Sequence, residues 1–249
     1  MALSVDIEKN LGSFRLRSRF ETGDETLALC GASGCGKSMT LKCIAGILRP
    51  DKGKIVLNGR TLFDSEKHID LPPQKRRVGY LFQQYALFPN LTVEQNIAVA
   101  LKGRSKEERG RIVAEKVRAF HLEGLEKHRP AQLSGGQQQR TALARIMASE
   151  PEILLLDEPF SALDSELRFH MENEVRQAIR DFRQSVILVT HNRGEAYRIA
   201  DRIASMEKGA ILSVLPKKEW IAASNSVIIQ VDTAPENIIV VNGGSGAQT

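Results

Sequence analysis

The chain has 249 residues, of which 42% are hydrophobic and 26% are charged, and its formal net charge is +5. This length allows one large domain or two modest ones with a substantial core, and the composition argues against wholesale disorder. The mild positive charge lies in short clusters without aromatic residues for stacking, so we expect no nucleic-acid partner.

Three cysteines, Cys30, Cys35 and Cys43, fall within one short segment without CxxC spacing or accompanying histidines. This arrangement argues against a disulfide framework and against a zinc site, and it predicts reduced thiols in the cytosol. The N-terminal sequence carries Asp6 and Glu8 where a signal peptide would be basic and then apolar. No apolar run approaches the roughly 18 residues of a membrane span. We therefore expect the chain itself to be soluble, whatever it attaches to.

Short strands are predicted in the first thirty residues. Hydrophobic and polar residues alternate in Leu3–Ile7 and in Phe14–Phe20, and a further strand, Thr26–Cys30, follows. Such alternation is typical of antiparallel strands with one solvated face. We expect this region to form an N-terminal antiparallel β-subdomain.

Buried strands and helices follow. Ile153–Asp157 and Val186–Thr190 are apolar runs that end in polar residues, as in central parallel strands with function at their carboxyl ends. Between about residues 90 and 150 apolar residues instead recur three and four apart, which predicts a helical subdomain inserted into a mostly parallel α/β core. The predicted division is residues 1–89 with 151–216 for the core, 90–150 for the helical subdomain, and 217–249 for a C-terminal tail that frays from Asn242.

The first glycine-rich segment, GASGCGKS, matches GxxxxGK[ST] between a predicted strand and a helix-compatible run. Glycines let successive N–H groups and a helix N-terminus face phosphate, with Lys37 on the β/γ oxygens and the Ser38 hydroxyl on Mg²⁺. The sequence therefore predicts a nucleotide-phosphate cradle. The predicted contacts are Gly31, Ala32, Ser33, Gly34, Cys35, Gly36, Lys37, Ser38 and Met39.

Two carboxylates end the strand Ile153–Asp157. Asp157 is placed to hold Mg²⁺, directly or through water, and Glu158 is placed to orient or deprotonate the water that attacks the γ-phosphate. Asp-Glu-Pro alone would more simply mark a strand end and a turn. Because the chain also has the phosphate loop, we prefer the interpretation that both carboxylates act on the nucleotide.

The second glycine-rich segment, LSGGQ at Leu133–Gln137, precedes a helical run. Ser134 is a natural N-cap, and the two glycines expose N–H groups toward an anion. No lysine or metal-binding hydroxyl follows, so this loop can complete a nucleotide site but not form one alone. Because one nucleotide already has its cradle, the second loop most simply serves the nucleotide of another copy in a two-fold dimer.

In this order, the motifs resemble those of the nucleotide-binding subunit of ATP-binding cassette (ABC) transporters, from about Val5 to Pro216. The resemblance implies a P-loop NTPase fold of the α/β class, with ATP and Mg²⁺ as cofactors. It also implies as partners a second copy of the chain, an integral-membrane permease and, indirectly, an extracytoplasmic solute-binding protein, at the cytoplasmic face of the membrane.

The resemblance also implies a role for each motif residue. Glu158, His191, Lys37 and Gln83 would be catalytic; Ser38, Gln83 and Asp157 would bind the metal; Ser134, Gly135, Gly136 and Gln137 would bind the partner's nucleotide. Ser161–Asp164 resembles the loop that lines the dimer interface. Where this family usually has an aromatic residue that stacks on adenine, the chain has Glu8. Phe14, the nearest aromatic residue, either takes this role or is a buried strand residue.

Sequence details favour one solute without excluding others. Phe82–Val93 and Pro159–Asp164 are similar to bacterial importer ATPases, and Lys9–Phe14 with Thr61–Ser65 looks most like the molybdate/tungstate importers. Importers of sulfate, iron, polyamine or sugar remain alternatives. Soluble ABC ATPases of DNA repair, chromosome structure or translation are a further alternative, but they split the cassette with long coils or carry two cassettes, and neither feature occurs here. Hydrolysis is expected because every catalytic residue is present.

Overall fold

Strands and helices alternate along most of the chain, of which the computed structural model describes residues 2–161, 165–223, 226–230 and 238–242. The strands are β1 (Leu3–Leu11), β2 (Phe14–Thr22), β3 (Thr26–Cys30), β4 (Lys52–Leu57), β5 (Arg60–Asp64), β6 (Ile69–Asp70), β7 (Val78–Leu81), β8 (Ile153–Asp157), β9 (Val186–Thr190), β10 (Arg202–Glu207), β11 (Ala210–Pro216), β12 (Ser226–Gln230) and β13 (Ile238–Asn242). The helices are α1 (Lys37–Ala45), α2 (Pro73–Arg76), α3 (Val93–Ala98), α4 (Lys106–Ala119), α5 (Gly135–Ala148), α6 (Ser165–Phe182), α7 (Arg193–Ile199) and α8 (Lys217–Ala223), with 3-10 turns η1 (Val99–Leu101) and η2 (Pro130–Gln132).

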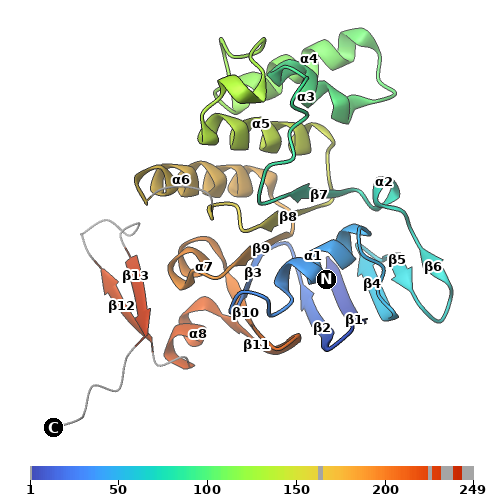
Figure 1. Cartoon of the computed structure of the whole chain (residues 1–249), viewed down its shortest axis with the longest axis vertical. Coiled ribbons are helices and arrows are strands. Elements are labelled where there is room, and N and C mark those ends of the chain that lie inside the picture. The colour runs from blue at the N-terminus through green and yellow to red at the C-terminus, as the bar shows by residue number, and fades with distance from the viewer. Residues whose placement is uncertain (1, 162–164, 224–225, 231–237, 243–249) are drawn as a thin grey trace.

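One mixed sheet contains all the described strands except the hairpin of β12 and β13 (Figure 1). Its order is β6-β5-β4-β1-β2-β11-β10-β3-β9-β8-β7. The strands β10, β3, β9, β8 and β7 pair parallel to one another, and β6, β5, β4, β1 and β2 pair antiparallel to one another. Between the two groups, β11 pairs antiparallel to β10 and parallel to β2. The carboxyl ends of β3, β7, β8 and β9 therefore meet at one edge, where function is expected.

Alternate residues of the parallel strands enter two hydrophobic clusters, one on each face of the sheet. In β8, Ile153 and Leu155 join the cluster that includes residues of α1. Leu154 and Leu156 join the cluster that includes residues of α5, α6 and α7. β3, β8 and β9 are buried at every position, which explains the continuous apolar runs in their sequences.

The prediction that Thr26–Cys30 belongs to the antiparallel strands is wrong. β3 lies in the parallel part of the sheet, between β9 and β10. The physical reason is that all of its residues are buried, so it has no solvated face. The antiparallel strands join the parallel part through β11, where Ala210 pairs with Arg17 of β2. Both parts therefore belong to one sheet.

Between residues 93 and 148 the described elements are all helices, as the spacing of apolar residues predicts. They share a third hydrophobic cluster, which includes Val93, Ile97 and Leu133. Figure 1 shows α3, α4 and α5 together at one end of the molecule, beyond β7. The division into subdomains at residues 90 and 150 stays a prediction.

The tail beyond Pro216 begins with α8, whose Trp220 is buried and donates from Nε1 to Oγ of Ser205 at 2.7 Å. Asn242, the first residue of the segment expected to fray, pairs with Ser226 in the β12–β13 hairpin. The rest of that segment, 243–249, lies outside the described residues. The tail therefore starts as a packed helix.

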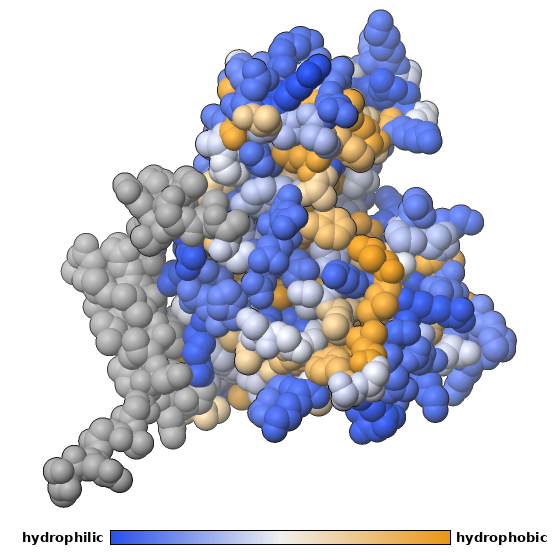
Figure 2. Space-filling model, viewed as in Figure 1, coloured by the Kyte–Doolittle hydropathy of each residue, from blue (hydrophilic) through white to orange (hydrophobic). Residues whose placement is uncertain are grey.

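Hydrophilic residues cover most of the face seen in Figure 2, and hydrophobic residues reach its surface in a strip over α1. Across the described residues, the large hydrophobic side chains with high exposure are Ile47, Phe88, Val99 and Leu212. None of the described helices is both long and apolar enough to cross a bilayer.

Candidate functional site

The loop from Gly31 to Gly36 connects β3 to α1, and its backbone leaves no room for side chains at two points. A Cβ on Gly31 would lie 2.2 Å from the carbonyl oxygen of Met206 in β10. Gly36 caps α1 with a φ of +111°, where a Cβ would lie 2.8 Å from Leu16. The loop therefore passes directly into the first turn of α1, whose unpaired N–H groups form a cradle for phosphate.

Lys37 places its charge over this loop. Its side chain is buried, and its Nζ donates to the carbonyl oxygens of Gly31 at 2.8 Å and Ala32 at 2.9 Å. A phosphate oxygen is a stronger, charge-assisted acceptor than either neutral carbonyl. The ammonium is thus positioned to exchange its loop contacts for phosphate.

Ser38 and Asp157 meet between α1 and the end of β8. Oγ of Ser38 donates to Oδ1 of Asp157 at 2.6 Å, and the hydroxyl of Tyr80 donates to Oδ2 at 2.8 Å. Burial, and then the nearby Asp157 carboxylate, raise the pKa of Tyr80, so its hydroxyl stays protonated and continues to donate. A hydroxyl and a carboxylate from two elements are hard oxygen donors, and Mg²⁺ beside a nucleotide needs few protein ligands. The residues present therefore fit this ion.

Glu158 and His191 come together from neighbouring parallel strands. Glu158 follows β8 with a left-handed φ of +47°, and its N–H donates to the carbonyl of Val189 in β9 at 3.0 Å. Its Oε2 lies 3.3 Å from Nδ1 of His191, the residue after β9. The site thus combines a carboxylate, which can accept a proton, with an imidazole beside it.

Gln83 reaches the same edge from the segment after β7. Its Nε2 donates to Oγ of Ser161 at 3.0 Å, and that hydroxyl donates to the carbonyl of Glu158 at 3.0 Å. One serine therefore links the glutamine to the backbone of Glu158. The remainder of the predicted interface loop, residues 162–164, lies outside the described residues.

The second glycine-rich loop is not part of this cluster. Ser134 and Gln137 form a capping box at the start of α5, in which Oγ of Ser134 accepts from the N–H of Gln137 at 3.3 Å. Among the described residues, no hydrogen bond or ion pair joins this loop to residues 31–38. Figure 1 shows α5 with the other helices at one end of the molecule and α1 below β7 and β8. The loop is therefore an ordered helix start that lies apart from the phosphate loop of the same chain.

Comparison with known protein families identifies the family to which the chain with this site belongs. The ABC transporter family model matches residues 19–161, more than half of the chain, and the match includes both glycine-rich loops and β8. The chain belongs to the ABC transporter family. This ABC cassette is an ATPase, as predicted from its motifs.

The cassette is similar to the molybdate/tungstate import ATP-binding protein WtpC of Archaeoglobus fulgidus, with 40% identity over 97% of the chain and 98% of that protein. It is 47% identical to the Fe(3+) ions import ATP-binding protein FbpC of Haemophilus influenzae, over 76% of the chain but only 54% of that protein. A solved ATP-binding cassette, a dimer bound to ADP and Pi, matches with a TM-score of 0.72 and 28% identity over 87% of the chain and 99% of that structure. The predicted P-loop NTPase fold is confirmed.

Two predicted nucleotide contacts of the cassette, Phe14 and Cys35, lie at the phosphate loop, and their roles stay predictions. Phe14 is half-buried against the α1 cluster, and its Cζ would lie 3.2 Å from a Cβ on Gly36, so the ring lies beside the start of α1. This position is compatible both with stacking on adenine and with a core role. Cys35 is 7% exposed, with its Sγ 3.9 Å from Nζ of Lys37.

Sequence reasoning missed several polar residues that support the cassette's site. Tyr80 enters it only because β7 pairs with β8, where Tyr80 lies opposite Leu155. Thr190 donates to Oε2 of the buried Glu195 at 2.5 Å and accepts from the N–H of Asn192, which holds the segment carrying His191. No local motif marks these residues, since their partners are fixed by strand pairing and helix packing.

Proposed function

We propose that the cassette is the ATP-hydrolysing subunit of an importer for molybdate, tungstate or a related oxyanion. The observation that carries the choice of solute is the similarity to WtpC, which extends over nearly the whole of both chains. The iron import protein FbpC has a higher sequence identity to the chain than WtpC, but the match covers a smaller part of its length. It supports the alternative, an importer of another solute such as iron.

Two copies of the cassette would form the working unit. The second loop offers an exposed, capped helix start without a lysine, so it suits the nucleotide held by Gly31–Ser38 of another copy. The dimeric relative bound to ADP and Pi supports this arrangement. Substituting Ser134 with arginine would place a large cation in the half-site.

The roles in hydrolysis follow from the contacts. Lys37 would transfer its hydrogen bonds from the loop carbonyls to the β- and γ-phosphates of ATP. Mg²⁺ held between Ser38 and Asp157 would supply neutralising charge at the same phosphates. Glu158 would accept a proton from the attacking water, and His191 would hold that carboxylate and stabilise charge on the γ-phosphate. Gln83 would report the state of this site to the loop that follows it.

A surface loop would connect this chemistry to the permease. Phe88 is 46% exposed, and the Arg145 guanidinium lies 5.6 Å from its ring. Arg145, on α5, also donates to the carbonyls of Tyr85 and Ala86 at 3.0 and 2.8 Å. Since the same loop begins at Gln83, a permease segment docked on Phe88 would be linked through Ser161 to Glu158. We place the cassette on the cytoplasmic face of the membrane, with a solute-binding protein acting indirectly.

The test is to capture the partner and then to measure transport. A tagged Glu158→Gln variant, trapped with Mg²⁺·ATP in its native cells, should recover a multispanning permease from solubilised membranes. Vesicles that contain the permease so identified, the unsubstituted cassette and its solute-binding protein should take up molybdate with ATP, whereas uptake of iron without molybdate would transfer the assignment to the alternative.

A double variant, Glu158→Gln with Ser134→Arg, is the matched control. It should bind ATP as a single subunit and fail to dimerise, because only the partner's half-site is blocked. Loss of ATP binding by the lone subunit would contradict the two-loop arrangement. Recovery of ribosomes or DNA in place of a permease would remove the transport assignment and leave the ATPase.

A further inference from the structure

A hollow of about 410 Å³ lies at the amino-terminal edge of the parallel strands, opposite the phosphate loop. Its lining includes Thr26, the first residue of β3, together with residues from the ends of α6 and α7 and the start of α8. Thr26 begins β3 and Gly31 follows its last residue, so the two are roughly 17 Å apart at about 3.3 Å per residue. The hollow is therefore separate from the ATP site.

Cations outnumber acids in this lining. The cations are Arg176, Arg180, Arg183, Arg198 and Lys217, and the acids are Asp24, Glu25 and Asp201. Two of these charges are already paired, because Glu172 holds Arg198 at 2.7 and 2.8 Å and Arg202 holds Glu25 at 2.8 Å. Within the part of the chain that the structure describes, the side chains of the three remaining arginines make no ion pair or hydrogen bond.

The three arginines and Lys217, whose Nζ lies 5.6 Å from the centroid of the Tyr197 ring, converge on the hollow from different segments of the chain. Arg176 and Arg180 are four residues apart, so they share one face of α6, and Arg183 follows the last residue of that helix with a left-handed φ of +51°. Lys217 reaches the hollow from α8, and its pKa is lowered by burial and then by Arg176 and Lys218, against the opposing effect of Asp201. The positive charges are thus close enough to repel one another.

Complementing the helix dipole explains only part of this cluster. Cations near a helix C-terminus are favourable, which accounts for Arg180 and Arg183. It does not account for Lys217 on another helix, or for Arg176 more than a turn earlier.

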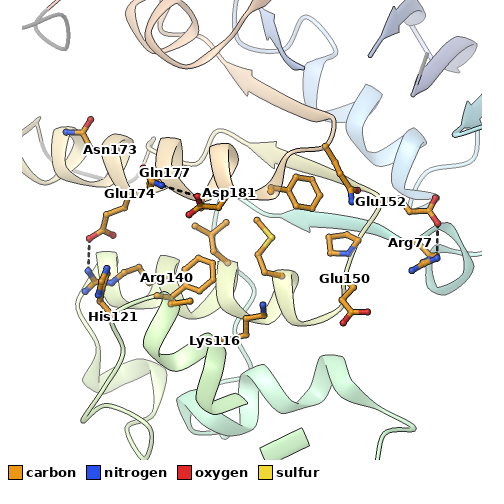
Figure 3. A pocket seen from close by; sticks show the side chains of 18 residues that line it. Arg77, Lys116, His121, Arg140, Glu150, Glu152, Asn173, Glu174, Gln177 and Asp181 are labelled. Carbon is orange, nitrogen blue, oxygen red and sulfur yellow. Dashed lines mark hydrogen bonds and ion pairs between the residues drawn. The ribbon is translucent and has the colours of Figure 1, made fainter. Parts of the chain in front are cut away.

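A second hollow provides a comparison within the same molecule. A larger cleft of about 690 Å³ between α5 and α6 has its charges matched, with Arg140 bound to Glu174 at 2.7 Å and Arg77 to Glu152 at 3.1 Å (Figure 3). The fold therefore pairs its charges in one hollow and leaves arginines unpaired in the other.

We propose that the smaller hollow binds a small molecule carrying two or more phosphoryl groups. Guanidinium groups match phosphate oxygens with two parallel hydrogen bonds. Arg176 lies about 9 Å along α6 from its last residue, Phe182, at about 1.5 Å per residue, and Arg183 follows that end, so the cations are spread over more than one phosphoryl group spans. The volume lies in the range of small-molecule sites. A concave hollow, in contrast to a flat basic stripe, favours a small ligand over nucleic acid.

The test is a titration with fructose 1,6-bisphosphate by calorimetry, with the phosphate loop saturated with Mg²⁺·ADP. We expect one bisphosphate per chain, and affinity at least about tenfold weaker in the triple variant Arg176→Gln, Arg180→Gln, Arg183→Gln, since each charged hydrogen bond contributes strongly. Lys217→Gln, on a different element, should weaken binding independently. If the triple variant fails to fold, the affinity of Lys217→Gln for the bisphosphate tests the site in its place.

The matched control removes the same charge from exposed arginines of α4, with Arg109→Gln, Arg111→Gln and Arg118→Gln, and should bind normally. Equal weakening in the control would overturn the site, because the effect would then be net charge alone. If saturating Mg²⁺·ADP abolished bisphosphate binding, the proposal would also be overturned, because the bisphosphate would then bind at the phosphate loop. Inorganic phosphate binding as tightly as the bisphosphate would assign the hollow to the free ion, and tighter binding of a DNA duplex would assign it to nucleic acid; either result overturns the proposal.

Discussion

Arg76 is fully buried, and its guanidinium holds the C-terminal end of α1. Its Nη1 donates to the carbonyls of Cys43 at 2.8 Å and Ile44 at 2.9 Å, and its Nε donates to that of Leu71 at 2.6 Å. In Arg76→Met the side chain keeps its length but loses every donor. The carbonyl of Cys43 retains the N–H of Gly46, so two carbonyls are left unpaired. The unpaired buried carbonyl of Ile44, the unpaired part-buried carbonyl of Leu71 and the loss of the 2.8 Å ion pair with Asp70 should together lower the free energy of unfolding by about 3 kcal/mol.

Urea unfolding followed by circular dichroism measures this loss directly. The neighbouring variant Arg77→Met is the control, because the Arg77 side chain is 59% exposed and its ion pair with Glu152 should contribute less than about 1 kcal/mol. A loss for Arg76→Met no greater than that for Arg77→Met would refute the argument that the buried carbonyls depend on Arg76. ATP affinity should fall along with stability, since the other end of α1 forms the phosphate cradle.

Tyr80→Phe should raise the Mg²⁺ concentration for half-maximal ATP hydrolysis by about tenfold, because Asp157 loses the donor that orients it; an unchanged Mg²⁺ dependence would contradict this. Burial raises the pKa of Glu195 above its ordinary value of 4.5, so the folded protein holds this proton more tightly and loses stability as the pH rises through the raised pKa. In urea unfolding measured from pH 4.5 upward, the Glu195→Gln variant should not show this loss of stability. If the free energies of unfolding of the variant and the unsubstituted protein changed in parallel with pH, Glu195 would not be the group responsible. N-ethylmaleimide should inactivate the ATPase slowly through the 7% exposed Cys35, with protection by ATP, because burial raises the pKa of Cys43 to about 12 and keeps that thiol unreactive. A Cys35→Ser variant that remains equally sensitive would show that another residue reacts.

The parts of the site that could be predicted are contiguous in the sequence. The loop Gly31–Ser38 and the pair Asp157–Glu158 each combine chemistry with a recognisable strand end, so short motifs were sufficient. The structure places Ser38 against Asp157 and Glu158 against His191, although their roles in hydrolysis stay predictions. The helices between 93 and 148 were predictable for a similar reason, since their period is visible locally.

The parts that could not be predicted depend on distant pairing. β3 lies in the parallel part of the sheet because it pairs with β9 and β10. These two strands come much later in the sequence. Tyr80 contacts Asp157 only because β7 lies beside β8. Arg76 resembles a surface residue in its basic segment, and only the approach of that segment to α1 buries it. Local patterns carry no information about such contacts.

The approach of Gly31 to Met206 has a consequence for biosynthesis. Met206 belongs to β10, which is one of the two neighbours of β3, and the other neighbour, β9, is also made late. The nascent chain therefore exposes the first glycine-rich loop long before the strands that shape it have left the ribosome. Such high contact order predicts slow folding and dependence on chaperones during synthesis. ATP binding by a stalled chain should begin only once β10 has emerged, which makes nucleotide retention a reporter of completed folding.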